Sequence, residues 1–149
     1  MKKGSILLLL LLSLSVVVNS QTIRSNGTGG GNWNSSDTWV GGVVPTAANS
    51  TSIVIQNGDV VSVPSGFQIE ADQLVLQANA VLQVNQGGFL DILNGAGTDL
   101  TLAASSKLFI SGILEFSHGV TSTNVVASTT TVRNGGVYRH AYTTAGRII

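Results

Sequence analysis

The chain has 149 residues, no cysteine, a formal net charge of zero and only 9% charged residues. It is one domain's worth of material, and its stability must come from packing rather than from disulfides or electrostatics. Without clustered Lys and Arg it cannot hold a phosphate backbone, which excludes a nucleic-acid partner. Its apolar content of 43%, arranged in short runs, argues against a disordered chain.

Residues 1–20 have the pattern of a secretory signal peptide. Lys2 and Lys3 precede an apolar run from Ile6 to Val18, and a small residue, Ser20, marks the expected cleavage point. A helix of this run would span about 20 Å, short of a hydrocarbon core of roughly 30 Å. The pattern predicts a secreted or cell-surface protein with no stable membrane span after cleavage.

Residues 21–50 show neither a helical nor a strand period and contain both tryptophans among Gly, Asn and Ser. We expect an irregular, Gly/Asn-rich N-terminal cap segment. The first turn of a repeat protein exposes core and unpaired strand edges, and Trp33 and Trp39 can cover them, because each indole buries on the order of 150–250 Å². The alternative is that the two rings form an exposed platform on which sugars stack.

Residues 51–149 consist of short apolar bursts bounded by Gly, Asn, Ser or Gln, the pattern of consecutive strands. Three of these segments repeat at a spacing of 24 residues, which aligns Gly88 with Gly112 and Gly136, Leu90 with Leu114 and Tyr138, and Ile92 with Phe116 and His140. A fixed period of this length indicates stacked supersecondary units.

The repeat predicts an all-β fold, a right-handed parallel β-helix with about 24 residues per coil. The recurring glycines are expected to adopt positive φ at its corners. The alternative is an antiparallel β-sandwich, whose strands are also short and regularly spaced. Because the repeat still runs at Gly135–His140 and the sequence finishes in Ile148 and Ile149, we expect the coils to be incomplete at the C-terminus, with further coils or self-association covering them.

The repeat also predicts a candidate ligand or cation ladder. If Leu90 and Leu114 point inward, then alternation turns Asp91, Glu115 and Arg139 outward on neighbouring rungs about 4.8 Å apart. Two carboxylates at this separation resemble a retaining glycosidase pair, and they are also suitable ligands for Ca²⁺. The third interpretation is an exposed Glu115–Arg139 ion pair with Asp91 solvated. The pattern identifies no catalytic or cofactor-binding residue and leaves the identity of any metal ligand open.

The motif G31-x-W33-x5-W39-x-G41-G42-x-x-P45, followed by I53-V54-I55, N57-G58 and V60-V61-S62-V63, resembles the N-terminus of secreted β-helical surface proteins of Bacteroidetes. It is similar to the opening of G8-type domains. The chain departs from that pattern at N49-S50-T51-S52, where an acidic residue is often found before the first strand. The resemblance implies a cell-surface, adhesin-like role and carries no catalytic residues.

These observations predict a non-enzymatic, secreted or cell-surface β-helical module with a structural or adhesive role. Its expected partners are an extracellular glycan or a surface protein, and no cofactor is expected beyond the Ca²⁺ considered above. The alternative is a fragment of a β-helical polysaccharide-degrading enzyme, a lyase or a glycosidase. An enzyme needs several ionisable groups that converge on one groove, whereas the sequence offers one short ladder.

Overall fold

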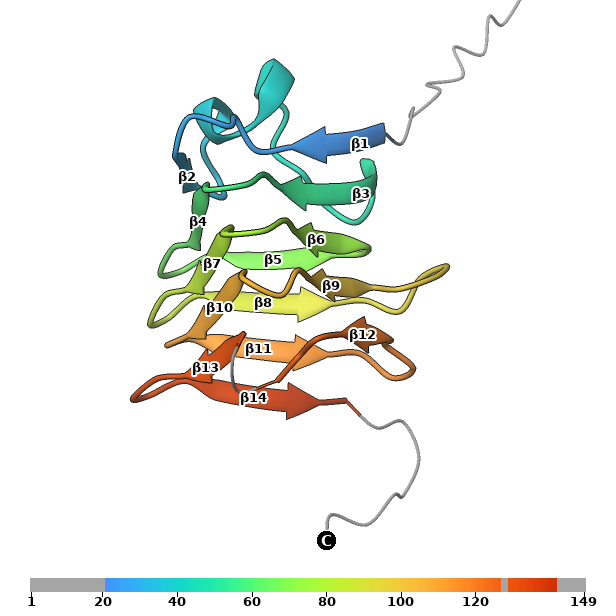
Figure 1. Cartoon of the computed structure of the whole chain (residues 1–149). Coiled ribbons are helices and arrows are strands. Elements are labelled where there is room, and N and C mark those ends of the chain that lie inside the picture. The colour runs from blue at the N-terminus through green and yellow to red at the C-terminus, as the bar shows by residue number, and fades with distance from the viewer. Residues whose placement is uncertain (1–20, 127–128, 142–149) are drawn as a thin grey trace, which may run out of the picture.

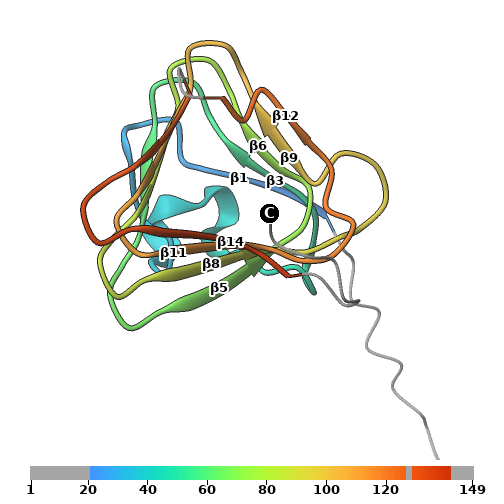
Figure 2. The same ribbon diagram turned by 90° about the horizontal axis from the view of Figure 1, so that it is seen from below.

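The computed structural model describes residues 21–126 and 129–141 as a β-solenoid of about four turns. The predicted signal peptide, residues 1–20, lies outside the described residues. The turns are stacked along one axis (Figure 1), and seen along that axis they enclose a roughly triangular section (Figure 2). Strands of successive turns pair in parallel throughout, which confirms the predicted parallel β-helix and shows that the antiparallel sandwich is wrong.

Three parallel sheets form the sides of the triangle, and each full turn contributes one strand to each sheet. The first sheet contains β1 (Gln21–Arg24), β3 (Ser50–Ile55), β6 (Leu74–Leu76), β9 (Leu100–Leu102) and β12 (Ser122–Thr123). The second sheet contains β2 (Gly30–Asn32), β4 (Val60–Val63), β7 (Val81–Val84), β10 (Lys107–Ile110) and β13 (Thr130–Val132). The third sheet contains β5 (Gln68–Ala71), β8 (Phe89–Ile92), β11 (Ile113–Phe116) and β14 (Val137–His140).

The predicted 24-residue register is present in the third sheet, where Leu90, Leu114 and Tyr138 lie opposite one another. Other turns differ in length. Ile69 lies opposite Leu90, only 21 positions later, whereas Leu82 lies opposite Leu108, 26 positions later. The additional residues are accommodated in the corner between β8 and β9, which bulges from the triangle in Figure 2. Corner loops therefore absorb changes in length while the strands keep their register.

Inward-facing residues of the three sheets form a single continuous core. Alternation along each strand places every second side chain inside, and Leu82, Leu90, Leu102 and Leu114 are all fully buried. Burying such a side chain contributes about 1.5–3 kcal/mol. In β14 the inward position of Tyr138 is 39% exposed, because no further turn lies below it among the described residues.

Gly88, Gly112 and Gly136 recur for a different reason from the one expected. None of them has a positive φ, and in two of the three corners that conformation belongs to the preceding residue, Gly87 or Gly135. A Cβ at Gly112 would lie 2.3 Å from carbonyl oxygens of the preceding turn, and one at Gly136 would lie 2.0 Å from such an oxygen. Glycine is required there because the backbones of adjacent turns approach each other too closely for any side chain.

The expected boundary at residue 50 is also corrected. Regular pairing begins at Gln21, since β1 pairs with β3 and β2 pairs with β4. Both early strands were missed because they are short and rich in glycine or polar residues. The irregular part of the cap is residues 33–49, which contains two short 3₁₀ turns, Ser36–Thr38 and Val40–Gly42. In Figure 2 this segment lies within the outline of the triangle, where it closes the N-terminal end.

The alternation predicts opposite effects of the same substitution at adjacent positions. Leu114→Asp places a carboxylate among buried rungs and should destabilise the fold by several kcal/mol, which is enough to unfold a domain of this size. Ile113→Asp, on the half-buried outer face of the same strand, should leave a cooperative thermal transition. Circular dichroism melting of both variants measures this difference, and equal melting temperatures would contradict the inward assignment.

Candidate functional site

The structure places Asp91, Glu115 and Arg139 in one column on the outer face of the third sheet. Asp91 lies opposite Glu115 in the ladder between β8 and β11, and Glu115 lies opposite Arg139 in the ladder between β11 and β14. Their inward neighbours Leu90 and Leu114 are fully buried, so the three charged side chains face solvent as the alternation predicts. The sheet thus brings together all three residues of the predicted ladder.

Glu70 of β5 extends this column by one rung and was missed from the sequence. It lies opposite Asp91, which makes three consecutive carboxylates, Glu70, Asp91 and Glu115, hereafter the carboxylate column. The signal was present in the segment Q68-I69-E70-A71, which alternates like the later strands. It was hidden because this turn is three residues shorter than the 24-residue repeat.

The carboxylate column has an ion pair at one end, and its middle residue, Asp91, is partly buried. An Arg139 guanidinium nitrogen lies 3.8 Å from a Glu115 carboxylate oxygen; the Arg139 side chain is exposed and the Glu115 side chain half-buried, so the pair contributes little to stability. The pKa of Asp91 is raised, first by burial and further by the charges of Glu115 and Glu70, although a hydrogen bond from Ser117 opposes the shift. The column can therefore attract cationic or hydroxyl-bearing ligands.

An apolar column, Phe89, Ile113 and Val137, runs beside the carboxylate column. These side chains share the outer face because they lie two positions before Asp91, Glu115 and Arg139 in the same strands. Phe89 and Ile113 are half-buried and Val137 is 38% exposed. The outer face of the third sheet thus combines parallel charged and apolar stripes on a rigid support.

Trp33 and Trp39 lie in the core of the cap. Trp33 is fully buried and Trp39 is 3% exposed, and their rings meet edge to face with centroids 5.1 Å apart. The Trp33 indole N–H donates to the Pro45 carbonyl and the Trp39 indole N–H donates to the Trp33 carbonyl. This arrangement fits the cap alternative and leaves no ring face on which a sugar could stack.

Asp59 anchors the glycine-rich loop of the cap to the first full turn. Its buried carboxylate accepts hydrogen bonds from the Ser25 hydroxyl and from the backbone N–H groups of Gly27 and Gly29, at 2.8 and 2.9 Å for the last two. Charge-assisted bonds of this kind are stronger than neutral ones. No sequence pattern predicted this contact, because its partners are about 30 residues apart in the chain.

Asp72 and Asp99 form a carboxyl pair at the corner between the third and first sheets. Asp99 is fully buried and accepts bonds from the Gly95 N–H and from the Thr121 N–H and hydroxyl. These bonds outweigh its burial and lower its pKa. The pKa of Asp72 is raised by burial and by the charge of Asp99, to which it is hydrogen-bonded. The two pKa values are thus shifted in opposite directions, so Asp72 is the member of the pair that takes up a proton first as the pH falls.

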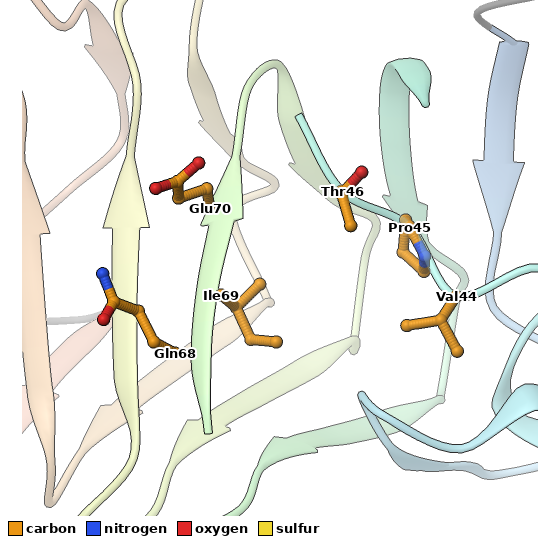
Figure 3. Close-up of a pocket in the computed structure, with 6 residues that line it drawn as sticks. All are labelled: Val44, Pro45, Thr46, Gln68, Ile69 and Glu70. Atoms are coloured by element: carbon orange, nitrogen blue, oxygen red, sulfur yellow. The ribbon is translucent and has the colours of Figure 1, made fainter. Parts of the chain in front are cut away.

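A pocket of about 300 Å³ lies between the cap and β5 (Figure 3), lined by Val44, Pro45, Thr46, Gln68, Ile69 and Glu70. Ile69 projects toward Val44 and Pro45, whereas Gln68 and Glu70 project from the other side of the strand. The pocket is apolar on its inner wall and borders the edge of the third sheet. Nothing in the sequence pattern predicted it.

No protein-family model, curated protein or solved structure matches the chain. The class of the molecule is therefore defined by its fold, a parallel β-solenoid, and the similarity to G8-type domains stays a prediction. Within residues 21–126 and 129–141, no helix has the length and apolarity to cross a bilayer. In the same part of the chain, no three His, Asp or Glu side chains gather closely enough to hold a metal ion.

The Asp59 contacts predict that the cap can be loosened separately from the coils. Asp59→Ala removes three hydrogen bonds to a charged acceptor and should cost roughly 2–4 kcal/mol in the cap. Since both tryptophans lie in the cap, their emission should shift to longer wavelength before the β signal melts. Asp37→Ala, at an exposed position of the same segment, is the matched control. Coincident transitions in both variants would argue against a separable cap.

The carboxyl pair predicts a pH dependence of stability. Because the folded-state pKa of Asp72 is raised, its contribution is present in acid and is lost as pH rises above its ordinary value of 3.8. Asp72→Asn should flatten the decrease in melting temperature as the pH rises above 3.8, since the amide N–H group can donate to Asp99 at every pH. Asp37→Asn serves as the control. An unchanged pH profile would contradict the raised pKa of Asp72.

Proposed function

We propose that the chain is a non-enzymatic, secreted or cell-surface β-helical module with a structural or adhesive role, and that the outer face of its third sheet binds an extracellular glycan. The observation that carries this proposal is the pairing of the carboxylate column with the apolar column on one rigid sheet. Carboxylates accept hydrogen bonds from sugar hydroxyls, and apolar side chains pack against the less polar faces of sugar rings.

The parallel register favours a repeating ligand. The two middle rungs each present one outward carboxylate and one outward apolar residue, Asp91 with Phe89 and Glu115 with Ile113. Neighbouring rungs are about 4.8 Å apart, so a polymer running along the axis meets the same kind of pair on two successive rungs. Such repetition raises the affinity of weak contacts through multivalency.

The distribution of the other acidic residues supports a binding role over the enzymatic alternative. Asp59 and Asp99 are buried and occupied by hydrogen bonds at corners, and Asp72 is paired with Asp99. An active site needs ionisable groups that converge on a groove. The outward carboxylates instead form a column on a flat sheet.

Export is part of the proposal and is supported by the N-terminal pattern of two lysines, an apolar run and a small residue. The resemblance of the tryptophan-containing segment to G8-type openings of Bacteroidetes surface proteins agrees with a location outside the cell. The low charge and absence of cysteine are compatible with a fold that is stabilised by stacking alone.

A glycan array probed with the purified chain tests this function. We expect selective retention of one class of polysaccharide, weakened at least about tenfold by the double variant Asp91→Asn, Glu115→Gln and unaffected by Gln83→Ala on the second sheet. Bound glycans should be recovered at unchanged mass. Shortened products would favour the polysaccharide-degrading alternative, and the absence of any selective retention would contradict glycan binding.

A further inference from the structure

The first strand of the third sheet is an incompletely covered edge. The first and second sheets begin with β1 and β2, whereas the third begins one turn later with β5. Residues of the cap occupy the position that an earlier strand would have taken. Sheet edges carry unpaired backbone groups that can pair with another chain, so the extent of this cover determines whether the edge is available.

The backbone pattern shows which groups of β5 face away from the sheet. Phe89 donates its N–H to the Phe67 carbonyl, and the alternation of a parallel ladder then directs the N–H and C=O of Gln68 and Glu70 to the opposite side. The cap uses one of these four groups, through the bond from the Ala47 N–H to the Glu70 carbonyl at 3.0 Å. The other three have no protein partner among the described residues.

The apolar pocket continues this edge toward the core. Ile69, between the two residues with outward groups, is 8% exposed and faces Val44 and Pro45 across the pocket (Figure 3). A strand added beside β5 would place the side chain opposite Ile69 into this space, because like positions stack on neighbouring strands. An apolar side chain suits the pocket.

The charge pattern specifies the neighbouring residue of such a strand. At the far end of the carboxylate column a basic residue lies on the rung beyond Glu115, with the Arg139 guanidinium 3.8 Å from its carboxylate. At the near end the exposed Glu70 carboxylate has no ion-pair partner in the described part of the chain. A Lys or Arg on a strand added beside β5 would end the column there in the same way.

We propose that the uncovered part of the β5 edge and the adjoining pocket bind an extended peptide segment of a partner protein by strand addition, with an apolar residue in the pocket and a Lys or Arg beside Glu70. Three unpaired backbone groups favour a polypeptide over a glycan at this edge, because their spacing matches another strand. This inference goes beyond the proposed function, since it concerns the sheet edge beside the proposed glycan-binding face, with which it shares Glu70, and a different class of partner.

A peptide with the required pattern exists within the chain itself. Residues 135–141, Gly-Gly-Val-Tyr-Arg-His-Ala, place an aromatic residue before an arginine, and the blocked, fluorescently labelled heptapeptide serves as the probe. We expect saturable binding in an anisotropy titration against the purified chain. Glu70→Lys should weaken it by at least about tenfold, and a peptide with Glu in place of Arg139 should recover affinity for that variant but not for the wild type.

Two further variants distinguish pairing through the β5 backbone from non-specific binding of the peptide. Gln68→Pro deletes an N–H that faces away from β8 and should abolish binding without loss of the thermal transition, whereas Gln68→Ala, which keeps the N–H, should retain it. Amide chemical shifts of Gln68 and Glu70 should move on titration. No saturable binding, or binding that ignores both the Glu70 and Gln68 variants, would overturn the proposal whatever the glycan array shows.

Discussion

Backbone pairing between successive turns is the constraint on which this molecule depends. With only 9% charged residues and no cysteine, each turn satisfies its strand hydrogen bonds with the turns before and after it. Nearest-neighbour dependence of this kind is characteristic of solenoids. It explains why most inward positions hold Leu, Ile or Val, and why inward residues such as Val132 and Tyr138 are exposed in the last described turn.

The corners are where the chain adjusts to that constraint. Apart from a register shift at the start of the β1–β3 ladder, the strands keep their register, so differences in length are taken up by the loops. The longest loop outside the cap lies between β8 and β9. Two such corners contain a buried aspartate, Asp59 or Asp99, whose carboxylate gathers backbone N–H groups from neighbouring segments. Each carboxylate satisfies donors that irregular backbone would otherwise leave unpaired. Charge is scarce in this protein, and part of it is used to hold the corners.

The sequence was sufficient to predict the fold because stacking in register leaves a periodic record. The 24-residue spacing of Leu90, Leu114 and Tyr138 reflects direct pairing, and it also predicted the outward column of Asp91, Glu115 and Arg139. The sequence-based prediction failed where a turn departs from the 24-residue spacing, or where the cause of a pattern is a contact between turns. Glu70 was lost to a shorter turn, and the recurring glycines were assigned to positive φ although close backbone approach explains them.

Contacts between the corners, and between the cap and the turns, have no periodic pattern in the sequence. The bonds that Asp59 receives from the cap, the pairing of Asp72 with Asp99 and the pocket beside Ile69 all join segments whose proximity depends on how the corners fold. No local pattern encodes these distances, because corner geometry is set by loop length and by the neighbouring turn. Periodicity therefore predicts the strands of a solenoid, whereas the structure of its corners and ends depends on three-dimensional contacts that the sequence pattern does not show.

The orientation of the hydrogen bonds has a mechanical consequence. In the stacked turns of Figure 1 the ladders run along the solenoid axis, so tension applied between the two ends loads the rungs one after another instead of shearing them together. Bonds loaded in series separate at lower force than bonds loaded in parallel, and each separated turn releases a length of slack chain. A solenoid with this bond orientation is expected to unfold turn by turn when it is stretched, and so to dissipate work over a long extension.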